Sequence, residues 1–213
     1  LTDHAFPVEL NATTRSALRR SSVLYSDEVA RDLLAVADDQ FDASTIQRLT
    51  AHDPWFNALL RTTCAPTLLS GGHAENALPR EASVTVNCRI LPGTPAVEIE
   101  KVIRGMMAGI DYDLEIVWDG LASDVSEIPD ALMEQIESLS EQVFGEIPVI
   151  PGMSTGATDG LFFRNAGIPV YGVSGLFAKP GDSGAHGLDE KIGVREFHVS
   201  VEFLNQLLRS IAD

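Results

Sequence analysis

The stretch from Pro151 to Glu190 constrains the fold of this chain more than any other part of the sequence. It begins with a loop rich in glycine, serine and threonine that leads into a short predicted helix, and Gly167 can end that helix in a left-handed conformation. The apolar run Ile168–Val173 then predicts a buried strand, and one histidine, His186, follows between small residues. Loops of this kind beside buried strands are where α/β proteins place their functional sites, so we expect a site here.

The charge of the chain argues against two classes of partner. Its 213 residues include 15 lysines and arginines and 31 aspartates and glutamates, which gives a formal net charge of −16. A surface this acidic is repelled by nucleic-acid phosphates and by anionic lipid headgroups. No apolar run approaches the roughly 20 residues of a membrane-spanning helix. We therefore expect neither nucleic acid nor a membrane among the partners.

Neither the first residue nor the cysteines fix the compartment. The chain begins at Leu1 without a visible signal peptide, so a cytoplasmic location and a periplasmic or secreted one, reached after removal of a leader, both stay open. Cys64 and Cys88 lie near predicted strands and have neither the spacing of a metal site nor that of a redox motif. We expect both to be buried thiols.

Residues 1–61 predict four helices. The first spans about Thr13–Arg20. Ser26, Asp42 and Pro54 each stand where a further helix can begin, because serine and aspartate are capping residues and proline is favoured in a first turn. We therefore expect an acidic helical region before the first strand.

Residues 62–121 change to strand character. Thr63–Leu69 and Ala82–Leu91 predict two strands, the second with alternating apolar and polar residues, joined as an antiparallel hairpin. A helix capped by Thr94 follows, and Leu114–Trp118 predicts a third strand. The order β-β-α-β predicts a small α+β sandwich.

Residues 122–213 have α/β order. A polar linker, Ala122–Pro129, precedes a helix, Asp130–Phe144, and a strand, Pro148–Ile150. The loop, short helix and strand described above then lead to a last helix. Parallel strands joined by helices fit this order. The last helix is expected to face the core with one apolar stripe, made of Phe197, Val201, Leu204 and Leu208.

His186 is the strongest candidate for chemistry. It stands between Ala185 and Gly187, where a ligand has room to approach, and its neutral imidazole can hold zinc. Asp189 or Glu190 can orient the imidazole ring by a hydrogen bond. The alternative is a loop histidine that bonds a backbone carbonyl. A zinc site needs three or four ligands, and no second histidine at ligand spacing, His-x-Asp pair or Glu-Glu pair accompanies this one.

A second group of residues is suited to binding an anionic substrate. Amides and hydroxyls at the start of the short helix can donate to an anion, and an arginine can bind a carboxylate. Asp159 can equally cap the helix, Arg164 can pair with an acid, and Asn76 is a turn residue by default. The candidates from this stretch are Ser154, Thr155, Gly156, Asp159 and Arg164.

Five motifs occur in an order typical of one enzyme family. They are the segments Gly71–Pro79, Val86–Gly93, Gly156–Gly160, Gly167–Gly172 and Ala185–Glu190. Together they resemble the zinc-dependent metallopeptidase family of aminoacylase, glutamate carboxypeptidase and succinyl-diaminopimelate desuccinylase. The resemblance covers Arg61–Ala212 well, and it covers Leu1–Leu60 only as a helical insertion that some members carry.

The resemblance implies an α/β fold with two parts. Family members have a parallel α/β catalytic domain with two zinc ions, interrupted by an α+β lid domain that forms a homodimer. Residues 1–121 then correspond to the lid with its helical insertion, and residues 122–213 to the C-terminal part of the catalytic domain. His186 matches a zinc ligand, and Glu190 is expected behind it. Asn76 matches a lid asparagine that contacts the substrate.

The implied reaction is hydrolysis of an amide or peptide bond next to a free carboxylate, in a peptide or an N-acyl-amino acid. The substrate carboxylate would lie beside the loop Ser154–Asp159. Leu161 stands where many members have arginine, and Arg164 follows three residues later, which changes its direction by most of a helical turn. The other zinc ligands and the catalytic glutamate of the family have no counterpart here, so we expect the chain to be inactive without a missing N-terminal half.

Two hypotheses follow. In the first, the chain is the lid and returning half of a zinc-dependent hydrolase. In the second, it is a non-catalytic dimerisation or binding module without metal. A serine hydrolase is a weaker third, because Gly152–Gly156 has Gly-x-Ser-x-Gly spacing but follows a proline and lacks a convincing histidine–acid pair.

Overall fold

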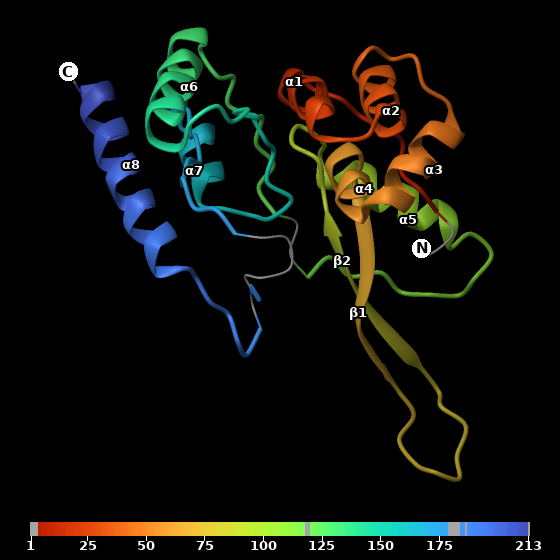
Figure 1. Ribbon diagram of the computed structural model, residues 1–213. Coiled ribbons are helices and arrows are strands. Elements are labelled where there is room, and N and C mark those ends of the chain that lie inside the picture. Colours follow the sequence, from red (N-terminus) through yellow and green to blue (C-terminus); the bar gives the residue numbers. More distant parts are fainter. Residues whose placement is uncertain (1–3, 118–119, 179–183, 186, 213) are drawn as a thin grey trace. The chain divides into compact units, whose positions relative to one another are not determined.

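The structure is a computed structural model that describes residues 4–117, 120–178, 184–185 and 187–212. These residues form two compact units (Figure 1). Unit 1 consists of the described residues within Leu1–Val125 and Pro151–Pro169, and unit 2 of those within Ser126–Ile150 and Val170–Asp213. Each unit has its own hydrophobic core.

Unit 1 begins with the predicted helical region. The helices are α1 (Ala12–Ser21), α2 (Asp27–Ala37), α3 (Ala43–His52) and α4 (Pro54–Leu60), and a short 3-10 helix, η1 (Ser22–Leu24), follows α1. All four α-helices contribute to one core, so this region packs as a small helical cluster. The buried core residues are Leu18, Leu33, Val36, Ala37, Ile46, Leu49, Phe56, Leu59 and Leu60.

Capping residues explain where these helices begin. The Asp42 side chain accepts from the Thr45 amide at 2.9 Å, and Thr45 closes a capping box in return. Pro54 opens α4, as predicted, with the Asp53 side chain accepting from the Trp55 amide at 2.8 Å. Ser26 stands at the capping position of α2, but its side chain makes no capping hydrogen bond.

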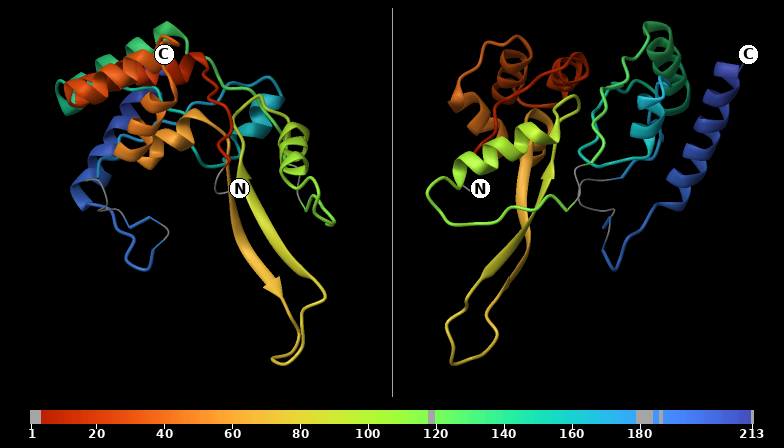
Figure 2. Two further views of the ribbon diagram at one scale, coloured as in Figure 1. Left: turned by 90° about the vertical axis from the view of Figure 1, so that its right-hand side faces the viewer. Right: turned by 180° about the vertical axis from the view of Figure 1, so that it is seen from behind.

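A single antiparallel hairpin follows the helices. It consists of β1 (Thr63–Gly71) and β2 (Ala82–Arg89), with a register shift at Thr67. Figure 1 and both views of Figure 2 show this hairpin projecting beyond the helices of unit 1. Its position agrees with the predicted strands to within two residues at each end.

Cys64 and Cys88 form a disulfide across this hairpin, so the prediction of two buried thiols was wrong. The two residues lie directly opposite each other in the ladder, with their Cα atoms 4.0 Å apart. Their 24-residue separation alone does not indicate this pairing, because it depends on the strand register.

Helix α5 (Ala96–Met106) follows the hairpin, and Pro95 occupies its capping position. Thr94 is therefore not the cap that the sequence predicted. Its hydroxyl donates to the Glu9 carboxylate at 3.3 Å instead. The predicted third strand is also absent from the described residues 114–117, which are irregular, and Trp118 lies outside the described residues. Within the described part of the chain, the sheet is the pair β1–β2.

Unit 2 is built on α6 (Asp130–Phe144) and α8 (Val194–Ala212). Phe203 and Leu207 of α8 pack against Ile136 and Leu139 of α6. The predicted stripe on α8 was therefore wrong, because the helix is apolar on more than one side and α6 covers a different side. Of that stripe, Leu204 packs beside the core, whereas Phe197, Val201 and Leu208 are 47%, 50% and 69% exposed.

The predicted parallel strands are not formed among the described residues. Residues 148–150 and 168–173 have no ladder partner. The second of these segments is held by hydrogen bonds to the linker instead, from the Val170 amide to Ser126 Oγ at 2.9 Å and from the Tyr171 hydroxyl to the Glu127 carbonyl at 2.8 Å. An apolar run favours a strand, but a strand requires a neighbour to pair with. None of the described helices is long and apolar enough to cross a membrane.

Candidate functional site

The loop that precedes α7 (Gly160–Asn165) is anchored to the helical cluster of unit 1. Met153 packs against the core of that cluster. The Asn11 side-chain amide, which also caps α1, donates to the sulfur of Met153 at 3.7 Å. The loop is therefore fixed from one side by a partly buried side chain before its polar residues begin.

Arg89, the last residue of β2, holds the same loop from another side. Its Nη1 donates to the carbonyl of Thr155 at 3.1 Å. A Cβ on Gly156 would stand 3.8 Å from this nitrogen, and the Gly156 amide donates to Ser154 Oγ at 3.1 Å. Strand β2 ends beside the predicted substrate loop, so the cationic side chain of Arg89 lies against that loop.

Arg89 was not among the site residues predicted from the sequence. The alternation of β2 was the available signal, since it sets Arg89 and Asn87 on the face opposite Val86 and Cys88. An arginine on the polar face at a strand end is well placed to meet a loop. Which loop it meets depends on tertiary structure.

Asp159 is not used as a helix cap. It stands at the capping position of α7, but its side chain makes no capping hydrogen bond. The Thr158 hydroxyl accepts from the Gly160 amide at 3.3 Å instead. At the other end, Gly167 has a φ of 81° and ends the helix as predicted, with the Ile168 amide donating to the Phe163 carbonyl at 2.9 Å. The exposed Asp159 carboxylate is thus left beside the loop.

The Arg164 side chain binds a different part of the chain from the loop before α7. Its Nε donates to Ser123 Oγ at 3.0 Å, and the neighbouring Asn165 donates to the Ala122 carbonyl at 3.1 Å. These contacts tie α7 to the chain segment that follows α5. Arg164 is half-buried there, so Arg89 is the arginine that contacts the loop.

Asn76 lies at the opposite end of the hairpin, in the exposed turn between β1 and β2. Strand geometry puts roughly 25 Å between that end of the ribbon and the Arg89 end. The structure therefore does not bring Asn76 to the loop Ser154–Asp159 within unit 1. Its predicted contact with substrate stays a prediction.

His186, the predicted metal ligand, lies outside the described residues. The residues that flank it make a tight turn, in which the Gly187 amide donates to the Gly184 carbonyl at 2.8 Å. A Cβ on Gly187 would stand 2.9 Å from the same carbonyl, so this position requires glycine. Glu190 is described and is exposed to solvent.

The described residues do not by themselves fit a metal ion. Among residues 4–117, 120–178, 184–185 and 187–212, no group of three or more histidines, cysteines, aspartates or glutamates is arranged to hold one. A metal centre needs at least three such ligands. The zinc site therefore stays a prediction that rests on His186.

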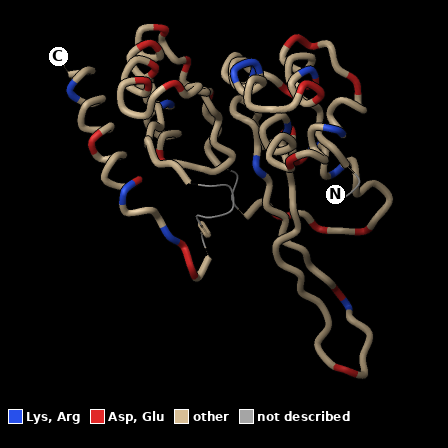
Figure 3. Tube along the Cα trace, viewed as in Figure 1, with Lys and Arg blue, Asp and Glu red and all other residues tan. Residues whose placement is uncertain are grey.

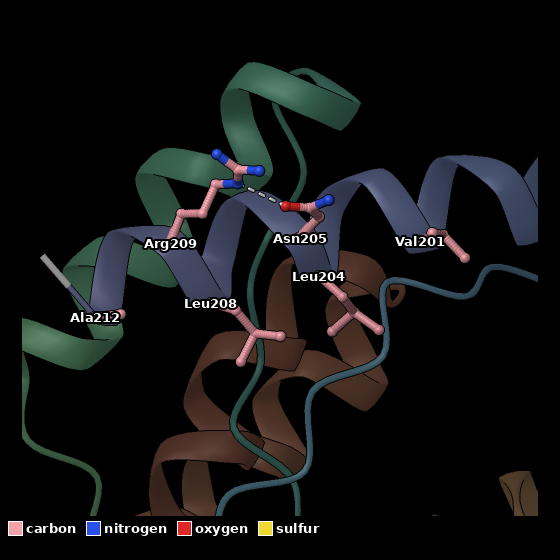
Figure 4. Close-up of a pocket in the computed structure, with 6 residues that line it drawn as sticks. All are labelled: Val201, Leu204, Asn205, Leu208, Arg209 and Ala212. Carbon is pink, nitrogen blue, oxygen red and sulfur yellow. Dashed lines mark hydrogen bonds between the residues drawn. The ribbon is translucent and has the colours of Figure 1, made fainter.

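A separate, open hollow of about 450 Å³ lies along α8 in unit 2 (Figure 4). Its polar side chains are Asn205 and Arg209, which are joined by a hydrogen bond of 2.8 Å. The other lining residues are apolar or small, so the hollow offers no acid, histidine or thiol for chemistry. They are Val201, Leu204, Leu208 and Ala212.

Comparisons with known proteins identify relatives. Residues 15–113 match the peptidase dimerisation domain, M20_dimer. The match begins inside α1, so it takes in the helical region that was predicted to be an insertion. The chain is 29% identical over 169 residues to the N-fatty-acyl-amino acid synthase/hydrolase PM20D1 of Homo sapiens, which covers 78% of this chain and 34% of that protein.

Two further relatives carry related names. The probable carboxypeptidase S-like 2 of Dictyostelium discoideum is 25% identical over 170 residues, covering 78% of this chain and 32% of that protein. The succinyl-diaminopimelate desuccinylase of Magnetococcus marinus is 28% identical over 148 residues, covering 67% of this chain and 36% of that protein. The chain thus spans about a third of the length of these relatives.

A solved structure has the same fold. It is the M20 family metallo-carboxypeptidase Sso-CP2 from Sulfolobus solfataricus, with a TM-score of 0.60, 18% identity, and coverage of 94% of this chain and 45% of that chain. The resemblance drawn from the five sequence motifs is confirmed by these relatives. The chain is therefore similar in sequence to M20 metallopeptidases, and its residues 15–113 match their dimerisation domain.

Proposed function

We propose that this chain is the lid, residues 1–121, and the C-terminal part of the catalytic domain, residues 122–213, of a metal-dependent hydrolase. The enzyme cleaves an amide or peptide bond next to a free carboxylate. The observation that carries this proposal is the contact of Arg89 with Thr155, which sets a cation beside a loop rich in amide and hydroxyl donors.

The chemistry of the loop supports an anionic substrate group. Ser154, Thr155 and Gly156 are exposed, and Arg89 has donors beyond the one that binds Thr155. A carboxylate accepts well from a guanidinium and from backbone amides together. Peptides and N-acyl-amino acids both present such a carboxylate, and the names of the relatives include a carboxypeptidase and an N-fatty-acyl-amino acid hydrolase.

The proposal places two zinc ions in the complete site, with His186 as one ligand and Glu190 behind it. Zinc supplies a hydrolytic centre when bound. The remaining ligands and the catalytic glutamate would come from a further part of the fold, which the relatives have the length to contain. This chain alone is then inactive, and in the complete enzyme it forms a homodimer through its dimerisation domain.

A non-catalytic role is the second candidate. The match to a dimerisation domain and the lack of a metal-binding group among the described residues are also what a binding module would have. The two candidates differ in zinc content and in turnover, which can be measured.

The test is His186→Ala in the complete protein, with zinc content measured by mass spectrometry and hydrolysis measured on N-acyl-amino acids and dipeptides. We expect zinc to be lost and kcat/KM to fall by at least about a hundredfold. His73→Ala, at an exposed histidine in the hairpin loop, is the control. Unchanged zinc and activity in His186→Ala would reject the metal-ligand role, and a complete protein without zinc or turnover would favour the binding module.

A further inference from the structure

The end of strand β2 is held by a covalent link one residue before Arg89. Cys88 precedes Arg89 and lies opposite Cys64, to which the disulfide joins it. On the other side of Arg89, the Leu91 amide donates to Thr62 Oγ1 at 3.2 Å, and both of these residues are buried. The backbone of Arg89 is therefore tied to the neighbouring chain segment on both sides.

The hydrogen-bonded ladder alone is a weak support for this end of the hairpin. The register shift at Thr67 cuts off an inner segment of four opposed pairs, which runs from the pair Thr63–Arg89 to the pair Pro66–Val86. Pro66 has no amide hydrogen to donate, and a shift of this kind interrupts the ladder. Two-stranded ribbons are marginally stable in water. The disulfide, which is the second of these four pairs, is therefore the tie near Arg89 that does not depend on ladder hydrogen bonds.

We propose that the Cys64–Cys88 disulfide positions Arg89 for binding the substrate carboxylate, so that the affinity of this site for an anion depends on the redox state of the bond. This inference rests on the proposed function and adds a positioning element to the same site. Cys88 and Arg89 are successive strand residues and project to opposite faces. The disulfide therefore acts on Arg89 through the backbone and leaves the guanidinium free to reach the Thr155 carbonyl.

A fixed strand end raises anion affinity because binding then has less to order. An arginine side chain loses rotamer freedom when it binds a ligand, and a mobile backbone beneath it adds to that loss. Strands β1 and β2 carry one charged residue, Arg89. Figure 3 shows the two strands largely in the colour of uncharged residues. No other residue of either strand can therefore supply the cation when Arg89 moves away from the loop.

The bond can be opened by thiol–disulfide exchange with a dithiol. Both cysteines are partly exposed, so a thiolate of the dithiol can attack one of the two sulfurs. The second thiol of the reductant then displaces the mixed disulfide, which leaves two cysteine thiols on the chain and the dithiol oxidised to a disulfide. The hydrogen bond from Leu91 to Thr62 does not involve the cysteines. We therefore expect the chain to stay folded while the end of β2 gains freedom.

The test is a double-mutant cycle in the complete protein. The Cys64→Ser, Cys88→Ser variant, Arg89→Ala and the combined triple variant are compared with wild type by kcat and KM on an N-acyl-amino acid and on its neutral carboxamide. We expect loss of the disulfide to raise KM for the carboxylate about three- to tenfold when Arg89 is present. In the Arg89→Ala background it should change KM by less than about twofold, because positions that act through one contact are not additive.

The carboxamide is the control for general loosening of the fold. Its KM, and kcat on both substrates, should stay close to the wild-type values. An equal rise of KM on both substrates would overturn the inference. So would a rise that is the same with and without Arg89, or no rise at all.

Reduction of the wild-type protein guards against misfolding of the serine variants. The protein is treated with dithiothreitol, separated from it under nitrogen, and checked by circular dichroism, thiol titration and zinc content. Hydrogen exchange of residues 152–159, which include the Gly156 amide bonded to Ser154 Oγ, is then compared with that of the oxidised protein by mass spectrometry. We expect faster exchange after reduction. Unchanged exchange would overturn the inference, whereas faster exchange in a protein without hydrolysis would support the positioning and reject the proposed activity alone.

Discussion

Arg89 and Thr155 are 66 residues apart in the sequence, and the Arg89 guanidinium donates to the Thr155 carbonyl at 3.1 Å. This contact joins the end of strand β2 to the loop before α7. It uses one nitrogen of the arginine, and the Arg89 side chain makes no other hydrogen bond in the described part of the chain. The guanidinium can therefore hold the loop and bind an anion together.

We predict that Arg89→Ala raises KM for substrates with a free carboxylate by roughly ten- to a hundredfold in the complete enzyme, because a charge-assisted hydrogen bond is lost. Arg89→Lys keeps the charge but loses the planar fork, so we expect an intermediate value. The measurement is kcat and KM on matched substrates with a carboxylate and with a neutral amide in its place. An equal loss on both substrates would indicate that Arg89 only supports the loop.

The disulfide makes the stability of the chain depend on redox conditions. Cys64–Cys88 closes a loop with a sequence separation of 24. Closing such a loop in the unfolded chain contributes about 3 kcal/mol to the free energy of unfolding by the chain-entropy estimate. We predict that a reductant shifts the urea midpoint of the wild-type protein downward by a corresponding amount. The Cys64→Ser, Cys88→Ser double variant should start at the lower midpoint and not respond. Alkylation of two thiols in the purified, unreduced protein would contradict the pairing.

The helical part of the fold could be predicted from the sequence because its signals are local. Asp42 and Thr45 are three residues apart, and a capping box needs nothing else. The two faces of β2 follow from alternation in the same way. Neither the Cys64–Cys88 pairing nor the Arg89–Thr155 contact has such a local signal, since one depends on strand register and the other on where a distant loop passes.

The capping box of α3 gives a pH prediction. Hydrogen bonds from the Ser44 side chain and from the Thr45 amide lower the pKa of the Asp42 carboxyl to about 2, below its unfolded value. Because folding lowers this pKa, the Asp42 carboxylate stabilises the folded state fully above its unfolded pKa of about 4. That stabilisation is lost as the pH falls toward 2.

We therefore predict that Asp42→Ala lowers the thermal midpoint at neutral pH by roughly 2 to 4 °C. Asp42→Asn keeps a capping oxygen without a titrating group, so it should stay close to wild type at neutral pH and lose less than wild type on acidification. Thermal unfolding followed by circular dichroism, stepped from neutral pH to about pH 2, makes the comparison. If the thermal midpoints of wild type and Asp42→Asn fall equally as the pH is lowered, other carboxyl groups dominate the acid dependence of stability.

Helix α8 offers the sharpest test of the packing in unit 2, because Leu207 and Leu208 are adjacent and identical but 5% and 69% exposed. The predicted stripe contained Leu208, whereas the structure buries Leu207 with Phe203 against α6. We predict that Leu207→Ala lowers the free energy of unfolding of this chain by about 2 to 5 kcal/mol, since it leaves a cavity in the core. Leu208→Ala should change it by no more than about 0.5 kcal/mol. Urea unfolding of both variants measures the two losses. A larger loss of unfolding free energy for Leu208→Ala than for Leu207→Ala would mean that α8 packs through the stripe that the sequence periodicity indicated.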